Sequence, residues 1–331
     1  MTQSLFDKKI DQNYGYALAN QKLDFKFIDL FAGIGGIRIG FEEFGGQCVF
    51  SSEWDEYAQT TYQANFGDKP NGDITKIDPK DIPNFNILCG GFPCQPFSMA
   101  GLRRGFEDTR GTLFFDVAKI IDFHKPQVIF LENVKNLATH DKGKTLQVIT
   151  QTLQDIGYKV FYKVLNAKDF GLPQNRARIY IVAFLNDVEF EFPIPPKNKT
   201  KVGWILEDQV NCKYTISDKL WEGHQRRKQQ HLERGNGFGY SMFTNESEYT
   251  STISARYYKD GSEILIYQDG KNPRKITPRE ASRLQGFPND YIIPVSDNRA
   301  YKQFGNSVAV PVIKAIAQSI ITTLQIYQVR L

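Results

Sequence analysis

Short apolar runs alternate with longer amphipathic stretches over the first 185 residues of the chain. The apolar runs are typical of buried strands, and we expect strands at residues 25–31, 47–51, 86–89, 128–132, 159–166 and 179–185. Between several of them, apolar residues recur at three- and four-residue spacing, most clearly over 145–156, which predicts helices. Strands that alternate with helices favour a parallel α/β sheet covered on both faces.

The pattern changes near residue 186, where Pro193, Pro195 and Pro196 precede a run of lysine and asparagine. Proline clusters of this kind mark boundaries, and the chain from there to about residue 276 is rich in Gly, Tyr, Arg and Thr. A last helix is expected to start at Pro311, because proline suits a first helical turn, and to pack on the first domain. We therefore expect an arm over 1–24, a large α/β domain over 25–190, a smaller and mostly β or irregular domain over 191–276, a hinge over 277–305, and a C-terminal helix over 306–331 that completes the large domain.

The 331 residues are 41% hydrophobic and 24% charged, which is typical of a soluble globular protein with one large and one smaller domain. No apolar stretch approaches the ~18 residues that a membrane span needs, and the N-terminus lacks the layout of a signal peptide. The four cysteines and four histidines show neither disulfide nor zinc spacing. A cytoplasmic protein without a metal is expected.

The net charge of +4 is too modest to indicate nucleic acid by itself, but the basic residues are clustered. Arg103, Arg104 and Arg110 lie close together in sequence, and Arg176 and Arg178 form a second cluster. A third run, HQRRKQQHLER at 224–234, favours a solvated helix face, because that is the usual place for such a run.

A cysteine, Cys94, stands between two prolines in the sequence GGFPCQPFS at 90–98, directly after a predicted strand. Pro93 and Pro96 fix their own φ and restrict the residue before them, so the thiol is presented in one direction. Such geometry suits a nucleophile. A buried cysteine that acts as a small hydrophobe is an equally weighted alternative for Cys94 taken alone.

The first strand is followed by a glycine turn, Gly33-x-Gly35-Gly36, that differs from the GxGxxG of dinucleotide folds. Glu53 follows the last glycine by seventeen residues, close to the spacing of a carboxylate that binds ribose hydroxyls. Trp54 could stack on an adenine, and Asp73 could accept from its amino group. The pattern indicates an adenosine cofactor without a pyrophosphate; a surface charge, a core ring and a turn former are the alternatives for these three residues.

Eight sequence blocks resemble, in the same order, those of the DNA cytosine-5 methyltransferases of bacterial restriction-modification systems. They are DLFAGIGG (29–36), EWD (53–55), GDI (72–74), GGFPCQPFS (90–98), ENV (132–134), QNRAR (174–178), TPREASRLQGFP (277–288) and QFGNSV (303–308). The resemblance covers the chain from residue 25 onward. It implies a Rossmann-like sheet that uses S-adenosylmethionine, with 25–190 as the catalytic domain and 191–276 as a target-recognition domain.

The resemblance also assigns roles to the residues of these blocks. Cys94 would add to C6 of cytosine, and Glu132 would contact N3 and the amino group as a protonated or proton-sharing carboxyl. Arg178 would contact the base carbonyl, with Arg176 supporting it. The positions that match the family's surroundings of S-adenosylmethionine are Phe31, Gly33, Gly35, Glu53, Trp54, Asp73, Ile74, Pro93, Leu113 and Asn306.

Double-stranded DNA is the implied substrate, and the target base would have to leave the duplex to reach the pocket. Arg103, Arg104 and Arg110 would meet phosphates from a loop that closes over the base. The segments 234–243 and 252–266 resemble the recognition region of the Dcm group, which acts on palindromes of the CCWGG and CCNGG type. The candidates for DNA contacts there are Arg234, Thr252, Arg256, Tyr257 and Tyr258.

Three other functions are weighed against this one. A tRNA cytosine-5 methyltransferase shares most of the motifs, but the Thr252-Ile253 pair is of the kind found in DNA target-recognition regions. A catalytically silent DNA-binding regulator is disfavoured because Cys94, Glu132 and Arg178 are intact. A nitrogen-methylating enzyme would present an acid or amide where FPCQ presents a thiol. A monomer is expected, and the sequence leaves open whether a cognate restriction endonuclease accompanies it.

Overall fold

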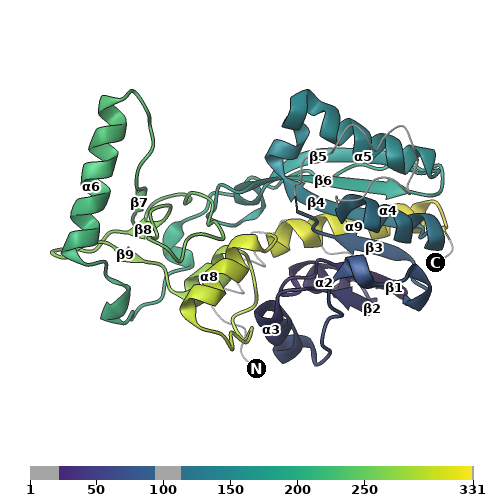
Figure 1. Cartoon of the computed structure of the whole chain (residues 1–331), viewed down its shortest axis with the longest axis horizontal. Coiled ribbons are helices and arrows are strands. Elements are labelled where there is room, and N and C mark those ends of the chain that lie inside the picture. Colours follow the sequence, from purple (N-terminus) through teal and green to yellow (C-terminus); the bar gives the residue numbers. More distant parts are fainter. Residues whose placement is uncertain (1–21, 94–112, 330–331) are drawn as a thin grey trace. The chain divides into compact units, whose positions relative to one another are not determined.

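The predicted apolar runs form the six strands of one sheet in the computed structural model, which describes residues 22–93 and 113–329 (Figure 1). The strands lie in the order β2-β1-β3-β4-β6-β5. All six expected strands are confirmed. Their bounds are β1 Phe25–Leu30, β2 Gly46–Ser52, β3 Ile87–Gly90, β4 Val128–Val134, β5 Lys159–Asn166 and β6 Ala177–Phe184.

The sheet is mixed, so the expectation of a parallel sheet was wrong for one strand. β1 pairs in parallel with β2 and β3, and β3 pairs in parallel with β4, but β4 and β6 are antiparallel. Parallel neighbours need a long crossover, normally through a helix. Between β5 and β6 the chain forms only the short 3₁₀ helix η7 (Ala167–Phe170), and it enters the sheet between β4 and β5 in the opposite direction.

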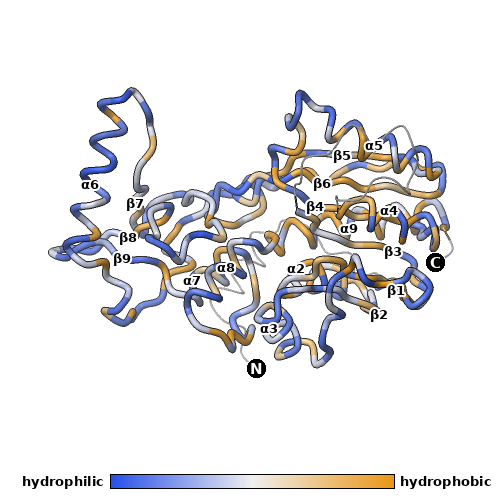
Figure 2. Tube along the Cα trace, in the orientation of Figure 1, coloured by the Kyte–Doolittle hydropathy of each residue, from blue (hydrophilic) through white to orange (hydrophobic). Residues whose placement is uncertain are grey.

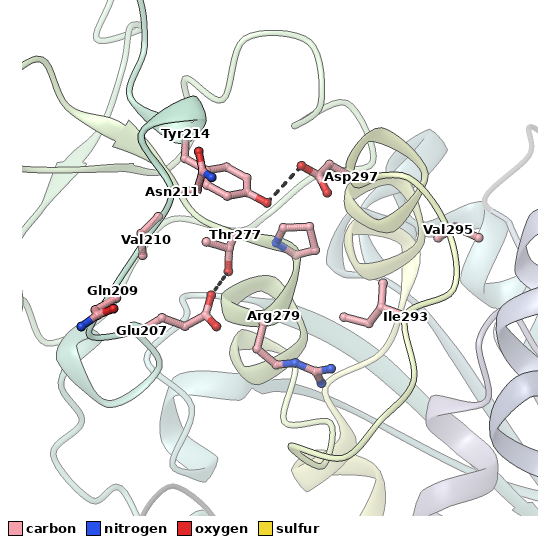
Figure 3. A pocket seen from close by; sticks show the side chains of 11 residues that line it. Glu207, Gln209, Val210, Asn211, Tyr214, Thr277, Arg279, Ile293, Val295 and Asp297 are labelled. Carbon is pink, nitrogen blue, oxygen red and sulfur yellow. Dashed lines mark hydrogen bonds between the residues drawn. The ribbon is translucent and has the colours of Figure 1, made fainter.

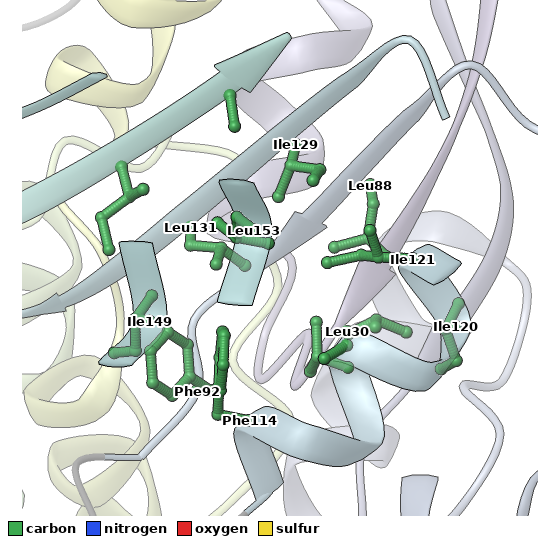
Figure 4. Packing of buried hydrophobic residues seen from close by; sticks show 14 of the residues in the cluster. Leu30, Leu88, Phe92, Phe114, Ile120, Ile121, Ile129, Leu131, Ile149 and Leu153 are labelled. Carbon is green, nitrogen blue, oxygen red and sulfur yellow. The ribbon is translucent and has the colours of Figure 1, made fainter. Parts of the chain in front are cut away.

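Helices α4 (Leu113–His124) and α5 (Lys144–Asp155) supply the core on one face of this sheet (Figure 4). The expected stripe on α5 is confirmed, because Leu146, Ile149 and Leu153 are all buried. Figure 4 shows side chains of both helices against those of the central strands, among them Leu30, Leu88, Ile129 and Leu131. In Figure 2 these strands are correspondingly hydrophobic along their length.

The other helices of the larger unit are α2 (Gly36–Glu42), α3 (Glu56–Phe66) and α9 (Val310–Ile326). α9 packs on α2 as expected for the C-terminal helix: a side chain on Gly40 would meet Ile313 at 2.5 Å. By length and composition Asp297–Ile326 could pass for a membrane span, but 72% of its most apolar window is buried, as in a core helix of a globular protein.

The chain divides into two compact units, each described here by itself. The larger contains the described residues up to Leu165, then Ala177–Ile194 and the chain from Val312 on; the smaller contains Asn166–Arg176 and Pro195–Pro311. The smaller unit holds three two-residue strands, β7 (Met242–Phe243), β8 (Leu265–Ile266) and β9 (Arg274–Lys275). The smaller unit also contains the 3₁₀ helices η7, η8 (Val202–Trp204) and η9 (Cys212–Tyr214), and the helices α6 (Asp218–Glu233), α7 (Pro278–Leu284) and α8 (Asp297–Asn306).

A buried ion pair organises the centre of the smaller unit. Arg274 Nη1 lies 2.7 Å from Glu280 Oε2, and Nη2 lies 2.8 Å from Oε1, with side chains 8% and 0% exposed. Glu280 also accepts the backbone N–H of Thr277 in a capping box that starts α7. Because a buried pair is costly to break on one side only, this bidentate contact fixes where β9 meets α7.

Candidate active site

The glycine turn after β1 leads directly into α2. Phe31, Gly33 and Gly35 have φ values of 57°, 56° and 80°, in the left-handed region that glycine adopts without strain. A side chain on Gly35 would collide with the ring of Phe66, 2.2 Å away. The turn therefore needs glycine at 35 for both conformation and space.

Glu53 is held against this turn by two backbone groups. Its Oε2 accepts from Gly33 N at 2.9 Å, and its Oε1 accepts from Asp55 N at 2.8 Å. Burial raises the pKa of the Glu53 carboxyl, and the two backbone donors oppose the rise. Each oxygen has a second lone pair, so the fixed carboxylate can still accept from ribose hydroxyls.

Trp54 and Asp73, the other two residues predicted to contact adenosine, are both accessible to solvent. The Trp54 side chain is 79% exposed, so the alternative of a core ring is wrong. Asp73 Oδ1 accepts from the backbone N and the hydroxyl of Thr75 at 3.0 and 2.8 Å, and these bonds lower the pKa of Asp73. Asp73 is thus a turn former and also an ionised hydrogen-bond acceptor. Together, Glu53, Trp54 and Asp73 fit an adenosine group.

The remaining predicted cofactor residues lie on several elements. Ile74 is 5% exposed behind Asp73, Phe31 and Leu113 are half-buried, and Pro93 is exposed. Asn306 is exposed at the end of α8 in the smaller unit. Their roles stay predictions.

Glu132 and Arg178 meet across the antiparallel pairing of β4 and β6. In the register, Glu132 is opposite Tyr180 and Val134 is opposite Arg178. Arg178 Nε lies 3.2 Å from Glu132 Oε1, and the side chains are only 14% and 11% exposed. The sheet therefore brings together two of the four predicted catalytic residues.

The segment that leads to Cys94 passes beside Glu132. β3 and β4 pair as far as Gly90 and Leu131, and Asn133 Nδ2 then donates to Phe92 O at 2.8 Å. A Cβ on Gly91 would lie 3.6 Å from Glu132 Oε2. Cys94, Arg103, Arg104 and Arg110 themselves lie outside the described residues.

Arg176, the fourth predicted catalytic residue, uses its guanidinium inside the smaller unit. It is 2% exposed and donates to Ile253 O at 3.2 Å, Gly305 O at 3.1 Å and Ser307 O at 2.5 Å. These contacts indicate that Arg176 positions two backbone segments, one at Ile253 and one at Gly305 to Ser307. Arg178, two residues later, directs its guanidinium to Glu132 in the larger unit.

One of the expected DNA contacts is corrected by the structure. Tyr257 is fully buried, donates to Ile264 O at 2.7 Å, and accepts from Ile276 N at 2.9 Å. A side chain held in this way belongs to the core and cannot reach a base. Arg234, Arg256 and Tyr258 are exposed, and Thr252 donates to Asn175 O.

A cavity of about 280 Å³ opens in the smaller unit (Figure 3). Figure 3 shows Arg279, Glu207, Tyr214 and Asp297 around it, with Glu207 bonded to Thr277 and Tyr214 bonded to Asp297. None of the predicted catalytic or cofactor residues that the structure describes lines this cavity. The described residues also contain no group of three or more His, Cys, Asp or Glu suited to a metal, and a metal-free site stays a prediction.

The comparison with known families decides the identity. Residues 25–322 match the C-5 cytosine-specific DNA methylase family. The chain belongs to this family. Because the family methylates cytosine in DNA, the chain is an enzyme that transfers a methyl group to cytosine. Enzymes of this family take the methyl group from S-adenosylmethionine.

The similar proteins include several type II methyltransferases. M.SsoII of Shigella sonnei is 64% identical over 311 residues, 92% of this chain and 82% of that protein. M.NlaX of Neisseria lactamica is 65% identical over 298 residues, 89% of this chain and 95% of that one. Over most of its length the chain is therefore similar to proteins that are named type II methyltransferases.

Solved structures confirm the fold. The Entamoeba histolytica methyltransferase EhMeth superposes with a TM-score of 0.74 and 21% identity, covering 92% of this chain and 99% of that one. The S. pombe Dnmt2 methyltransferase gives 0.74 and 20%, with the same coverage. At these identities the likeness shows the α/β methyltransferase fold alone.

Sequence reasoning missed two buried polar residues, one of which fixes the segment beside Glu132. Asn133 stands in the ENV block and fixes Phe92, and its place directly after Glu132 was the available signal. Asp29 is fully buried in β1, and within the described chain its carboxylate oxygens have no hydrogen bond of ordinary geometry. A polar residue inside the apolar run 25–31 was the signal for Asp29.

Asp29 is expected to make stability depend on pH. Burial raises the pKa of Asp29 from 3.8 to about 8, against the opposing charge of Arg38. Between these values the unfolded chain releases a proton that the folded protein retains, so stability falls as pH rises from about 4 to about 8. The free energy of unfolding of the wild type should fall by up to about 1.4 kcal/mol per pH unit because of Asp29, and Asp29→Asn should lack this fall. Urea unfolding from pH 5 to pH 8 measures both proteins. Parallel stability curves for the two proteins would contradict the assignment.

Trp54 should report cofactor binding. S-adenosylhomocysteine is expected to quench tryptophan fluorescence and to raise the melting temperature, because a ligand that binds only the folded state stabilises it. Trp54→Phe should lose the quench, although Trp204 and Trp221 remain, and should keep a melting shift. NAD serves as the control that should do neither. A quench that survives in Trp54→Phe would place the adenine elsewhere.

Proposed function

We propose that this enzyme methylates C5 of a cytosine that has been flipped out of duplex DNA, through a covalent bond between Cys94 and C6. The observation that supports it is the arrangement around Glu132. Arg178 contacts the carboxylate from β6, and Asn133 holds Phe92, two residues before Cys94. A carboxyl and a guanidinium fixed next to the approach to a thiol form the set of groups that this chemistry needs.

The order of events follows from the electronic structure of cytosine. C5 is a poor nucleophile until the Cys94 thiolate adds at C6, which forms an S–C bond and moves an electron pair toward C5 and N3. Glu132 delivers a proton to N3, so the negative charge does not accumulate on the ring. After the methyl group has been transferred to C5, the N3 proton returns to Glu132, and loss of the C5 proton to water and expulsion of the Cys94 thiolate restore the 5,6 double bond.

Glu132 and Arg178 have separate tasks in this proposal. The contact between the Arg178 guanidinium and the Glu132 carboxyl keeps Glu132 in place before the base arrives. Arg178 then orients the ring by donating to the base carbonyl. Because both groups sit on adjacent strands rather than on loops, their separation is set by the sheet.

S-adenosylmethionine supplies the electrophilic methyl group when bound. The residues that would hold it are Glu53 at the ribose, Trp54 on the adenine face, and Asp73 at the adenine amino group. The backbone N–H groups of Gly33 and Asp55 fix the orientation of the Glu53 carboxylate and leave the second lone pair of each oxygen free to accept from the ribose. The glycine turn lets the backbone approach the ligand closely.

The target is proposed to be the inner cytosine of a CC…GG palindrome, read by the smaller unit. This rests on the likeness of 234–243 and 252–266 to the Dcm group and on the exposure of Arg256 and Tyr258. Arginine that donates two hydrogen bonds to guanine is the commonest specific contact in the major groove. We further propose a cytoplasmic monomer that works beside a cognate restriction endonuclease.

Cys94→Ser should abolish methyl transfer, because a hydroxyl is far less ionised and nucleophilic than a thiol at neutral pH. Cys212→Ser is the matched control, since Cys212 is an exposed free cysteine outside the proposed site. A 5-fluorocytosine duplex with cofactor should trap the wild type and the control as gel-stable adducts. Glu132→Gln should slow transfer at least ~100-fold, the scale of lost general acid catalysis. Robust methylation by Cys94→Ser would overturn the covalent mechanism.

Arg256→Ala should relax specificity at one guanine by about 1–3 kcal/mol while the enzyme remains able to methylate. Bisulfite sequencing of DNA from cells that express each protein measures this, with Lys271→Ala as a control on another exposed loop. Wild-type methylation confined to GCGC or GGCC would refute the proposed target, but not the chemistry.

A further inference from the structure

The two backbone groups that hold the Glu53 carboxylate belong to different elements of the larger unit. Gly33 N, which donates to Oε2, lies in the turn that leads into α2, whereas Asp55 N, which donates to Oε1, belongs to the residue that caps α3. Gln59 of α3 also donates to the Glu53 carbonyl. Because the two oxygens of a carboxylate are a fixed distance apart, both carboxylate bonds form only when α2 and α3 keep one spacing. The contacts that join these two helices therefore decide how Glu53 is presented.

Apolar packing gives α3 only a weak hold on the rest of the unit. Its buried residues are Ala58, Gln59, Thr61 and Tyr62, and two of these four are polar. A helix of eleven residues depends for its stability mainly on the burial of an apolar face, and the apolar face of α3 is small. Polar contacts must therefore contribute to the position of α3.

Arg38 of α2 makes such contacts with α3, which lies beside α2 in Figure 1. Its Nε donates to Glu42 Oε1 at 2.7 Å, one turn further along α2. Its Nη1 donates to the Tyr62 hydroxyl of α3 at 2.9 Å and to Asp68 Oδ1, two residues beyond α3, at 2.7 Å. The Arg38 side chain is only 11% exposed. A planar guanidinium can donate in these several directions at once, which the single ammonium group of a lysine cannot do with the same geometry.

The same guanidinium lies against the ring that fills the space beside the glycine turn. Arg38 Cζ is 4.5 Å from the centre of the ring of Phe66, the last residue of α3, and a cation over an aromatic face is attracted to it. A side chain on Gly35 would meet this ring at 2.2 Å. Phe66 therefore contacts both Arg38 and the turn that contains Gly33.

We propose that Arg38 is a positioning residue for the binding of the methyl donor. It fixes α3 against α2, and thereby keeps the two backbone donors at the spacing that presents the Glu53 carboxylate to the ribose. The inference rests on the proposed contact between Glu53 and S-adenosylmethionine. Arg38 acts through Glu53 and does not itself contact the cofactor, so its effect is on the affinity for the cofactor and not on the methyl-transfer step.

Arg38→Met removes the guanidinium and keeps a long side chain. It should raise the Kd for S-adenosylhomocysteine and the KM for S-adenosylmethionine at least about tenfold, because a loosened carboxylate makes poorer hydrogen bonds to the ribose. The kcat and the KM for a duplex substrate should stay within about twofold of the wild type, since an interaction that serves cofactor binding alone does not change the chemical step. Calorimetric titration and steady-state kinetics of the whole enzyme measure these constants.

Lys314→Met is the matched control, because it removes an ion pair at the end of α2 that does not involve α3. Lys314 Nζ of α9 lies 2.6 Å from Glu43 Oε2, and Glu43 is the residue that follows α2. Both cofactor constants should be unchanged in this variant. Asp68→Asn, in contrast, weakens the contact with Arg38 from the side of a carboxylate that is 53% exposed, and it should raise the same constants by a smaller factor.

A double-mutant cycle with Glu53→Ala separates positioning from general destabilisation. Because Arg38 acts through the Glu53 carboxylate, Arg38→Met should change the Kd for S-adenosylhomocysteine less than about twofold in a protein that already lacks this carboxylate. If Arg38→Met fails to fold, as its melting curve would show, Asp68→Asn runs the same cycle. A wild-type Kd in the variant, or an equal rise in Kd with and without Glu53, would overturn the proposal. An unchanged Kd in Glu53→Ala alone would instead overturn the proposed cofactor contact, and the role of Arg38 with it.

Discussion

The two-sided pairing of β4 is the constraint on which the rest of the candidate site depends. β4 binds β3 in parallel on one edge and β6 in antiparallel register on the other. The first pairing brings Gly91 and Phe92 beside Glu132, and the second brings Arg178 to the same carboxylate. Because strand register is fixed by main-chain hydrogen bonds along seven residues, a shift by one residue would turn Glu132 to the opposite face.

The two units differ in how their buried polar groups are paired. In the smaller unit Gln174 and the Arg274–Glu280 pair are held by carbonyls, amides or each other, and Arg176 donates to three backbone carbonyls. These networks join segments that are far apart in sequence, and each would be costly to leave half-satisfied. In the larger unit Asp29 is buried beneath the glycine turn without a comparable set of partners, so it costs stability at neutral pH. The cost is consistent with strain retained at a functional site.

The turn at the end of α6 and the glycine turn after β1 need glycine for different reasons. Gly33 and Gly35 are required because the backbone conformation there is left-handed and the space beside Gly35 is filled by Phe66. Gly235 is required for a similar conformational reason, but the space around it is open. The first turn belongs to the proposed cofactor site, whereas the second returns the chain at the end of a helix.

The sequence by itself determined the strands, the glycine turn, the α5 and α9 helices and the order of the motif blocks. These features are local: apolar periodicity and left-handed glycines depend on residues a few positions apart. Only the tertiary structure decided the direction of β6, the burial of Tyr257 and the contacts of Arg176. Arg176 bonds to residues 77 and 129 positions away, and Tyr257 accepts from a residue 19 positions on. An exposed and a buried tyrosine have the same local sequence signature, since burial is set by which distant segments pack over the side chain.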